Sequence, residues 1–412
     1  MDSNFILTDE MNSIISQIEM KNNLFITGKA GCGKTTFLHY LQERYQDKAI
    51  TVAPTGVAAL NAEGVTIHSM FSLPIGFLNP EEKFKYSLPM NKKSLLAKAE
   101  ILIIDEISMV RCDLMDAINR RLQIVRRNKN PFGGLQVLMF GDMAQLSPVC
   151  KDSEYGLINR FYNGINFYDA LVFTKEKCCF YVSELSKIFR QKDANFIEIL
   201  DHVRNGNITP NDYQLLNNCY GNLDDNAIHL CAVKREAETI NETKLGTPTK
   251  VYQAKVKGEF NIDNAICSQE LKLREGARVM IIVNDNDGNR YCNGTLGVVK
   301  KLMNESAVVE LDETKELVTI NKYTWKSFKY EVDETNPLEV KIKKVENGSC
   351  EQIPLLLGWA ITIHKSQGLS FDKVNVHLNN IFAKGQVYTA LSRCRSLNGL
   401  HLDGVINQYR LR

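Results

Sequence analysis

Leu24-Phe25-Ile26-Thr27-Gly28-Lys29-Ala30-Gly31-Cys32-Gly33-Lys34-Thr35 is the most informative stretch of the chain. Its apolar start predicts a buried strand, and the residues that follow, 34–44, predict a helix. The glycine-rich turn between them fits the phosphate-binding P-loop pattern, in which backbone N–H groups approach phosphate oxygens without hindrance from a Cβ. In that pattern Lys34 reaches the β- and γ-phosphates, and the Thr35 hydroxyl binds Mg²⁺. A chance glycine-rich turn is the alternative, and the strand–turn–helix context disfavours it.

Short apolar runs alternate with amphipathic stretches throughout the first half of the chain. The predicted strands are Leu24–Thr27, Ile50–Ala53, Ile101–Ile104 and Gln136–Phe140. Strands separated by helical segments indicate βαβ units and a parallel sheet. Residues Val65–Lys98 hold three prolines and are long for a strand–helix connection, so we predict a small functional insertion there.

The second half, from about Phe180, shows a similar pattern with an interruption. Its predicted strands are Tyr181–Leu185, Ile228–Leu230, Leu355–Ile363 and Lys373–Leu378. The interruption, from about Gly246 to Ser349, contains β-branched runs at 277–283, 295–299, 307–311 and 316–320. Asn-Gly pairs at 293–294 and 347–348 are typical of hairpin turns, so this region resembles a small all-β barrel inserted into an α/β domain.

Composition restricts the class of protein. The chain has 412 residues, enough for about three domains, and its 44% apolar and 24% charged residues are ordinary for globular proteins. A formal net charge of +2 excludes a uniformly basic protein, so a nucleic-acid partner requires a local basic groove. We expect no membrane span, because no apolar run approaches roughly 18 residues. We also expect no secretory signal, because the residues Met1–Phe5 lack a basic region that leads into an apolar core. The eleven cysteines form no Cys-x-x-Cys pair, which favours reduced thiols and a cytoplasmic protein.

Acidic and amide side chains follow two of the predicted strands. Asp105 and Glu106 come directly after Ile101–Ile104, where Asp105 is expected to hold Mg²⁺ and Glu106 to orient and deprotonate the attacking water. The alternative is a solvated acidic turn, which is the minority interpretation behind a P-loop. Gln145 lies in the segment Gly141–Pro148 after the fourth strand, and we assign it to sensing the γ-phosphate; a simple polar turn is the alternative.

Two arginines of the second half are candidates for contact with the γ-phosphate. Arg190 and Arg393 lie in Ile188–Gln191 and Ala390–Arg395, whereas Arg395 is better interpreted as a surface charge. An arginine delivered from another domain is worth ~10³–10⁵ in rate. A P-loop kinase or GTPase is disfavoured, because the GTPase motif Asn-Lys-x-Asp is missing and a second α/β half is present.

Taken in order, these motifs resemble superfamily-one DNA helicases of subgroup B, above all the Pif-type (petite integration frequency) family, with RecD-like enzymes as relatives. The segments that carry the resemblance are 28–35, 53–59, 67–71, 105–109, 141–148, 189–191, 363–368 and 391–393. It extends from residue 7 to about residue 396. It implies an α/β fold of tandem RecA-like P-loop domains with parallel sheets, a small wedge insertion in the first and an SH3-like β-barrel insertion in the second.

The resemblance also implies boundaries and an activity. The first RecA-like domain would span 1–178 with a wedge at 65–98, the second 179–245 and 350–412, and the barrel 246–349. The implied activity is ATP-dependent, Mg²⁺-requiring translocation from 5′ to 3′ on single-stranded DNA, with unwinding of duplex and G-quadruplex DNA in genome maintenance such as repair, recombination or telomere maintenance. The expected partners are single-stranded DNA, forked duplex and G-quadruplex DNA, with no membrane. We expect a monomer of bacterial, phage or plasmid type, associated with the nucleoid.

The resemblance assigns site residues by position. The nucleotide-binding residues are Gly28, Ala30, Gly31, Cys32, Gly33, Lys34, Thr35, Thr36, Asp105 and Gly368, with Thr35 and Asp105 as metal ligands. The catalytic residues are Lys34, Glu106, Gln145, Arg190 and Arg393. Two positions depart from the family: Met11 stands where glutamine is frequent in the adenine-reading segment, and Cys32 where serine or threonine is frequent.

Single-stranded DNA is held by phosphate contacts and by base stacking, worth about 1–3 kcal/mol per base. The predicted contact residues are Pro54, Thr55, Gly56, His68, Phe71, His364, Lys365 and Ser366. A core position is an equal alternative for Phe71 and the preferred one for Phe77, and His68 has a structural alternative. In the inserted barrel, lysines alternate with aromatic rings at Lys322, Tyr323, Trp325, Lys326, Lys329 and Tyr330. These residues could hold DNA, and a solvated barrel face is the slightly preferred alternative. The rival function is an ATP-gated DNA-binding subunit without independent unwinding.

Overall fold

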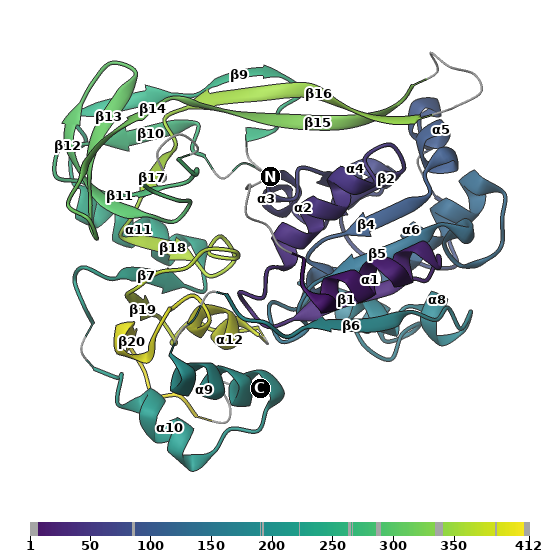
Figure 1. The fold of residues 1–412 in the computed structure, drawn as a ribbon, viewed down its shortest axis with the longest axis horizontal. Coiled ribbons are helices and arrows are strands. Elements are labelled where there is room, and N and C mark those ends of the chain that lie inside the picture. Colours follow the sequence, from purple (N-terminus) through teal and green to yellow (C-terminus); the bar gives the residue numbers. More distant parts are fainter. Residues whose placement is uncertain are drawn as a thin grey trace. The chain divides into compact units, whose positions relative to one another are not determined.

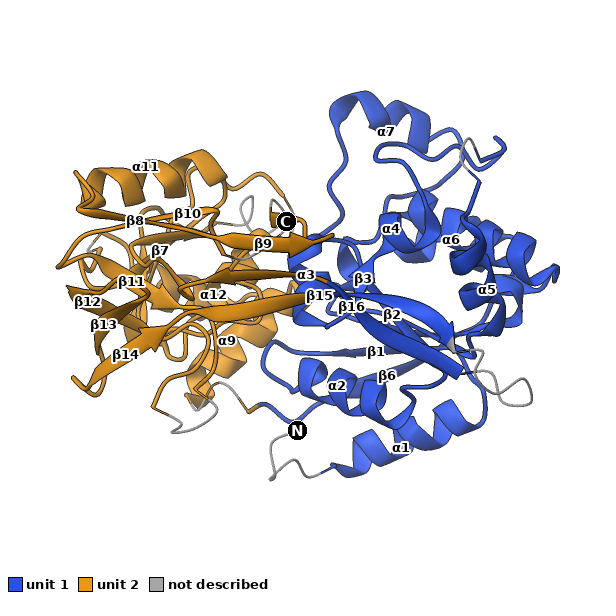
Figure 2. Ribbon diagram, turned by 90° about the horizontal axis from the view of Figure 1, so that it is seen from above, with its two compact units in different colours: residues 1–143, 147–188, 327–347 blue, residues 144–146, 189–326, 348–412 orange. Residues whose placement is uncertain are grey.

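The computed structural model describes residues 7–84, 87–189, 191, 193–221, 223–262, 265, 267–285, 290–333, 341–383 and 385–407. The chain forms two compact units, coloured in Figure 2. Unit 1 comprises residues 1–143, 147–188 and 327–347, and unit 2 comprises 144–146, 189–326 and 348–412. The domain boundaries expected at 178 and 245 remain predictions.

Unit 1 is built on a six-stranded sheet with the order β3-β2-β4-β5-β1-β6, in which all neighbouring strands are parallel (Figure 1). Its strands are β1 (Leu24–Gly28), β2 (Ala49–Ala53), β3 (Val65–Thr66), β4 (Ile101–Ile104), β5 (Gln136–Phe140) and β6 (Tyr181–Leu185). The residues of β1, β2, β4 and β5 are all buried. This confirms the four strands and the parallel sheet predicted for the first half.

Helices cover both faces of this sheet. They are α1 (Asp9–Glu19), α2 (Lys34–Arg44), α3 (Gly56–Asn61), α4 (Ile67–Phe71), α5 (Met90–Lys98), α6 (Cys112–Arg126), α7 (Asp152–Ile158) and α8 (Leu171–Thr174), with 3₁₀ turns at Ile107–Met109, Pro131–Gly134 and Phe167–Asp169. Alternate strand residues serve opposite faces: Ile103 packs in the cluster that contains Phe37 of α2, whereas Leu102 packs with Ile118 of α6. The period of two along a strand therefore produces two cores from one apolar run.

The strand at Tyr181–Leu185 was predicted in the second half, and this is wrong. As β6 it is the edge strand of the unit 1 sheet, where Leu24 pairs with Tyr181 and Gly28 with Leu185. A Cβ on Gly28 would lie 2.5 Å from the Leu185 carbonyl oxygen, so the first P-loop glycine also permits this close pairing. Such a pairing joins residues far apart in sequence, and the strand's own composition does not reveal its partner.

Unit 2 contains a four-stranded parallel sheet with the order β18-β7-β19-β20. Its strands are β7 (Ile228–Cys231), β18 (Ala360–Thr362), β19 (Val374–Val376) and β20 (Leu400–Leu402). The helices of this unit are α9 (Ala194–Asn205), α10 (Pro210–Asn217), α11 (Lys234–Leu245) and α12 (Gln386–Leu391), with a 3₁₀ turn at Leu397–Gly399. The predicted second α/β half is thus confirmed.

An antiparallel sheet with the order β14-β13-β12-β11-β17 forms the core of the inserted β region. Its strands are β11 (Arg278–Ile281), β12 (Leu296–Leu302), β13 (Ser306–Leu311), β14 (Leu317–Asn321) and β17 (Leu355–Leu357), and β8 (Lys250–Gln253) pairs with β10 (Glu270–Leu273). The single strand predicted over Leu355–Ile363 is wrong. The segment divides at Gly358: β17, before it, pairs in the antiparallel sheet, and β18, after it, pairs in the parallel sheet. At Gly358 the backbone passes close to β11, since a Cβ there would lie 2.6 Å from the Val279 backbone carbon.

A long pair of strands, β15 (Tyr323–Asp333) and β16 (Lys341–Gln352), forms a third sheet with β9 (Lys255–Gly258). The hairpin turn predicted at Asn347-Gly348 is wrong, because both residues lie within β16 and Gly348 pairs with Gly258. A Cβ at Gly348 would collide with the backbone of Phe260, so this glycine permits a close strand approach. Residues 327–347 of this pair belong to unit 1.

Tyr330 of β15 lies on the edge of the unit 1 sheet and is 8% exposed, which corrects its predicted place on a solvated face. Its hydroxyl accepts a hydrogen bond from the Thr51 backbone N–H at 3.1 Å. The edge strand β3 pairs only with Val52 and Ala53 of β2, so Tyr330 satisfies a donor that β3 does not reach. The Ile342 N–H donates to the Asp47 carbonyl at 3.0 Å alongside.

We expect the substitution Tyr330→Phe to destabilise unit 1 by about 1–3 kcal/mol, because it leaves the buried Thr51 N–H without an acceptor. Urea unfolding, combined with amide hydrogen exchange at Thr51, measures the effect. Tyr323→Phe on the same strand is the matched control, since Tyr323 is 43% exposed. Equal stability of the two variants would show that the Tyr330 hydroxyl contributes nothing to the sheet edge.

A chain of hydrogen bonds crosses the unit 2 sheet. Asn375 Nδ2 lies 3.4 Å from His229 Nε2, His229 Nδ1 lies 2.8 Å from His377 Nε2, and His377 Nδ1 lies 3.1 Å from Asp403 Oδ2. The carboxylate of Glu236 lies 3.4 Å from the same His377 nitrogen. Burial first, and then the neighbouring His377, lowers the pKa of His229 from 6.5 to about 4. His229 is therefore neutral in the folded protein at pH 7.

Because the unfolded chain binds a proton at His229 below pH 6.5 and the folded chain does not until about pH 4, the stability of unit 2 should fall as the pH drops through this window. The loss is greatest at the acid end of this window, and solvent screening at the partly exposed ring makes it smaller than the pKa shift alone would give. Urea unfolding at pH 7 and pH 5 measures it. His229→Gln should flatten the pH dependence, whereas His39→Gln in unit 1 should not; equal slopes in all three proteins would contradict the assignment.

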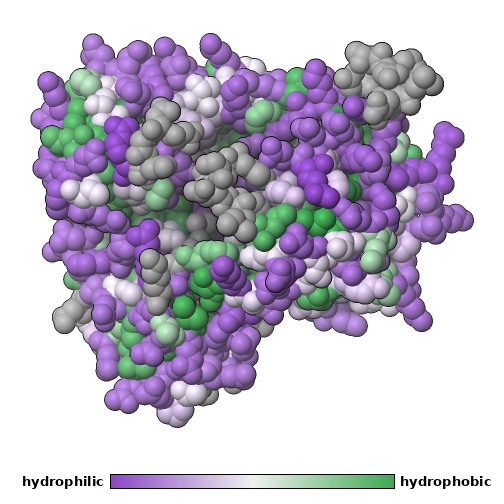
Figure 3. Space-filling model, viewed as in Figure 1, coloured by the Kyte–Doolittle hydropathy of each residue, from purple (hydrophilic) through white to green (hydrophobic). Residues whose placement is uncertain are grey.

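The face in Figure 3 is covered mainly by hydrophilic side chains, with hydrophobic ones scattered among them. Across the described parts of the chain, every helix is too short or too polar to cross a membrane.

Candidate functional site

The P-loop occupies the turn between β1 and α2, as predicted. Gly31 and Gly33 adopt positive φ angles of 82°, a conformation that favours glycine. Gly33 is the N-cap residue of α2 and no side chain caps this helix end. The first N–H groups of α2 are thus left for a ligand, and the Thr35 and Thr36 side chains are exposed beside them. These features fit a bound phosphate group.

Lys34 folds back over the loop. Its ammonium donates to the Gly28 carbonyl at 2.7 Å and the Lys29 carbonyl at 3.0 Å, and it lies 3.6 Å from the Cys32 sulfur. Cys32 is buried, with 1% of its surface exposed. The cation is therefore held at the mouth of the loop by neutral acceptors that an anionic oxygen would outcompete.

Asp105 and Glu106 leave the carboxyl end of β4, two strands away from β1 in the sheet. Glu106 adopts φ 48° and ψ 47°, a left-handed conformation that is strained for a residue other than glycine. Burial, and then the charge of Glu106, raises the pKa of Asp105 to about 7, while Lys34 opposes this rise. Unit 1 thus brings together Lys34, Asp105 and Glu106, and a divalent cation fits a carboxylate pair that is costly to ionise without one.

Gln145 belongs to unit 2 and is 7% exposed. Its carbonyl lies against Gly385, the N-cap of α12, where a Cβ would collide with it. Sequence reasoning missed Gly385. It has a positive φ of 82°, and a single glycine outside a motif does not reveal such a conformation. The predicted role of Gln145 toward a γ-phosphate remains a prediction.

Arg393 is 1% exposed, and its guanidinium is directed into unit 2. Nε donates to the Thr389 carbonyl at 2.9 Å, Nη1 to the Ser366 and Leu369 carbonyls at 3.3 Å each, and Nη2 to the Ser392 hydroxyl at 2.8 Å. In this structure it joins the segments 362–369 and 389–393, and its role as an arginine finger remains a prediction. Arg190 lies outside the described residues.

Phe71 was predicted to stack on a base, and this is wrong. The ring is fully buried in the unit 1 core with Ile67 and Met70 of the same helix. Phe77 packs against Phe161, with ring centroids 6.2 Å apart, in agreement with its predicted core position. Phe71 lies on the buried side of α4, and its ring therefore has no exposed surface on which a base could stack.

The remaining predicted DNA-contact residues of unit 1 surround two helix starts. Pro54, Thr55 and Gly56 follow β2, and the Thr55 hydroxyl accepts from the Ala58 N–H at 3.2 Å as the N-cap of α3. His68 is half-buried in α4; burial, then Arg111, lowers its pKa. Both His68 and the 54–56 turn stay candidates for a neutral, hydrogen-bonding contact.

The unit 2 candidates lie in the loop after β18. His364 and Lys365 are half-buried, and burial lowers the pKa of each. The Ser366 hydroxyl is buried and donates to the Ile363 carbonyl at 2.8 Å, so the prediction of a DNA contact through this side chain is wrong. Gly368 is exposed and has a φ of 79°, a conformation that favours glycine.

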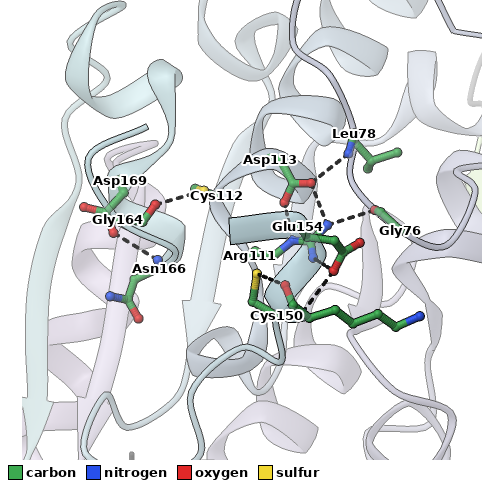
Figure 4. A network of polar contacts seen from close by, with 11 residues as sticks. Gly76, Leu78, Arg111, Cys112, Asp113, Cys150, Glu154, Gly164, Asn166 and Asp169 are labelled. Carbon is green, nitrogen blue, oxygen red and sulfur yellow. Dashed lines mark hydrogen bonds and ion pairs between the residues drawn. The ribbon is translucent and has the colours of Figure 1, made fainter. Parts of the chain in front are cut away.

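A buried ion network holds the predicted insertion (Figure 4), and sequence reasoning missed it. Arg111 pairs with Asp113 at 2.6 Å and with Glu154 at 2.9 Å, and it donates to the Gly76 carbonyl at 2.9 Å. The Leu78 N–H donates to Asp113 at 2.8 Å. Arg111 and Asp113 are two residues apart in sequence, but nothing in their spacing predicts a contact with residues 76–78.

Two α/β units with parallel sheets, one of which carries a P-loop and a strand-end Asp-Glu pair, define a nucleotide-binding protein of the tandem RecA-like class. The chain belongs to the PIF1-like helicase family, whose model matches residues 6–214. The predicted fold class and family are thus confirmed.

Relatives and solved structures agree with this family assignment. The ATP-dependent DNA helicase Pif1 of Campylobacter jejuni is 31% identical over 94% of this chain and 90% of that protein. The ATP-dependent DNA helicase PIF1 of Xenopus laevis is 31% identical over 96% of this chain, which spans only 61% of that relative. Bacteroides Pif1 in complex with ADP-AlF4 is 44% identical with a TM-score of 0.91, covering 99% of this chain and 94% of that one. Bacteroides Pif1 bound to ssDNA is 44% identical with a TM-score of 0.69 and the same coverage.

Proposed function

We propose that this chain is an ATP-dependent DNA helicase that moves from 5′ to 3′ on single-stranded DNA and unwinds duplex and G-quadruplex DNA in genome maintenance. The main observation that supports the proposal is that Lys34, Asp105 and Glu106 lie together at one edge of the unit 1 sheet. The names and complexes of the relatives, which include ATP-dependent DNA helicases and complexes with ADP-AlF4 and ssDNA, support it.

The nucleotide would be held by Gly28, the 30–36 segment and Gly368, with Mg²⁺ on Thr35 and Asp105. The metal supplies positive charge that neutralises the phosphate oxygens. Glu106 orients and deprotonates the attacking water, and Lys34 stabilises the charge that develops on the transferred group. Gln145, Arg190 and Arg393 would respond to the γ-phosphate, which for Arg393 requires its present carbonyl partners to be exchanged.

DNA would contact the 54–56 turn and His68 in unit 1, and His364 and Lys365 in unit 2. A monomer acting on single-stranded or forked DNA, in the nucleoid of a bacterium or on phage or plasmid DNA, fits this proposal. One solved structure, 44% identical to this chain, describes unwinding at forked dsDNA by two coordinating Pif1 helicases, so a second copy on one fork is a natural extension.

A fluorescence unwinding assay on 5′-tailed and 3′-tailed duplexes, with ATPase activity measured in parallel, tests the proposal. We expect DNA-stimulated hydrolysis and strand separation from the 5′ tail alone. Separation from the 3′ tail alone would contradict the direction. Stimulated hydrolysis without separation on either substrate would support the ATP-gated DNA-binding subunit instead.

A further inference from the structure

A cavity of about 320 Å³ lies within unit 2, away from the loop that carries His364 and Lys365. One side is formed by barrel turns, including Cys292 and Lys315, and the other by residues that precede β7 and β19, including Asn226 and Asp372. The 363–369 loop leaves the carboxyl end of the parallel sheet, whereas these residues lie at its amino end. The lining contains none of the residues proposed to contact nucleotide or DNA.

Charged side chains dominate the cavity lining, with four basic and three acidic residues. Each acid already faces an arginine: Arg278 pairs with Asp312 at 2.7 Å, and Arg395 lies 2.7 Å from Asp372 and 3.3 Å from Glu313. The remaining lining cations are Lys315 and Lys373, and Lys373 pairs with Asp224 outside the lining. The lining thus holds one more basic than acidic side chain, and among the described residues Lys315 is the lining cation without an ion pair.

Arg278 supplies the observation that points to a ligand. The residue is 8% exposed, and its Nη2 is engaged by Asp312 and by the Asn226 carbonyl. Its Nε–H is buried and has no hydrogen-bond partner among the described residues. A buried donor of a charged group is seldom left without an acceptor, so an acceptor supplied from outside the chain is a physical explanation.

The carboxyl groups of Glu313 and Asp372 reinforce this charge balance. Their mutual hydrogen bond, and then burial, raises the pKa of Glu313. Although burial opposes it, the hydrogen bonds from Glu313 and Arg395 lower the pKa of Asp372. Of the two carboxyl groups, Glu313 is therefore the one whose pKa is shifted upward by the pair.

We propose that this cavity binds a phosphate group, carried either by a free nucleotide or by the 5′ end of a DNA strand. A phosphate monoester offers several acceptor oxygens, which suit the guanidinium of Arg278 together with Lys315 and Lys373. The volume falls at the lower end of the ~300–1,000 Å³ range of small-ligand sites. The proposal does not depend on the helicase activity.

Cys292 provides a local reporter, because its exposed thiol lines the cavity, and the exposed Cys179 of unit 1 is an internal reference. Iodoacetamide labelling of the full chain is followed at both thiols by peptide mass spectrometry. We expect inorganic phosphate to slow the labelling of Cys292 at least fivefold, saturably, and to leave Cys179 unchanged. Chloride at matched ionic strength should have no effect, and the protection should persist in Lys34→Ala, whose P-loop is impaired.

The double variant Lys315→Gln/Lys373→Gln should lose most of this protection, and Lys301→Gln, an exposed lysine outside the lining, should keep it. A deoxynucleoside monophosphate is then compared with 5′-phosphorylated and 5′-hydroxyl oligonucleotides. Stronger protection by the mononucleotide identifies a free ligand, and stronger protection by the phosphorylated oligonucleotide identifies a DNA end. No protection by any phosphate probe, equal protection in the double variant, or equal protection by both oligonucleotides would overturn the proposal.

Discussion

Lys34→Ala is expected to lower kcat for DNA-stimulated ATP hydrolysis by about a thousandfold, close to background. The ammonium that it removes is already placed at the mouth of the P-loop by the Gly28 and Lys29 carbonyls. Alanine keeps the helix propensity of α2 but leaves the loop with backbone donors only, so charge developing on the transferred phosphoryl group loses its nearest cation. A coupled phosphate-release assay at saturating single-stranded DNA measures the effect.

Lys48→Ala is the matched control, because Lys48 is an exposed lysine of the same unit whose ion pair, among the described residues, is with Glu100 on the surface. It should keep nearly full activity. A Lys34→Ala protein that retains a tenth or more of the wild-type kcat would show that the P-loop lysine does not carry the chemistry proposed here.

Glu106→Gln is expected to separate nucleotide binding from hydrolysis. The amide has the same size as the carboxylate but cannot accept a proton, so kcat should fall by about 10²–10⁴ while the Kd for ATP changes by less than about threefold. A fluorescent ATP analogue reports binding, and phosphate release reports turnover.

Glu100→Gln, at the other end of the same strand, removes an exposed carboxylate and should leave both quantities unchanged. Normal turnover in Glu106→Gln would remove this residue from the proposed mechanism. A loss of nucleotide binding instead would indicate that the left-handed backbone at residue 106 has collapsed.

Local signals were sufficient wherever an element is defined by its own residues. The strand–turn–helix around the P-loop and the strand before Asp105 follow from apolar runs and glycine positions, and the structure has them within a residue or two. Long-range pairing was not predictable from these signals. Tyr181–Leu185 reads as a strand of either sheet, and Asn347-Gly348 reads as a turn until Gly258 is known to lie opposite.

The same distinction holds for the candidate site. Lys34, Asp105 and Glu106 were predictable together, because parallel strands bring their carboxyl ends to one edge. The burial of Phe71, Ser366 and Arg393 could not be predicted. The neighbouring residues in the sequence do not tell whether such a side chain is exposed or buried. Function and packing compete for such residues, and only the tertiary contacts decide which prevails.

The hydrogen bond between Tyr330 and Thr51 of β2 has a consequence for the synthesis of the protein. The Thr51 position of the unit 1 sheet is covered by the segment 327–347, which is translated long after Ile188. This position is therefore uncovered while the ribosome synthesises the intervening chain, for roughly 10–30 s at about 5–20 residues per second. An uncovered edge is a site of mispairing between nascent chains. A fragment that ends at Ile188 would carry that open edge permanently, and expression of unit 1 alone therefore requires the 327–347 segment to be supplied with it.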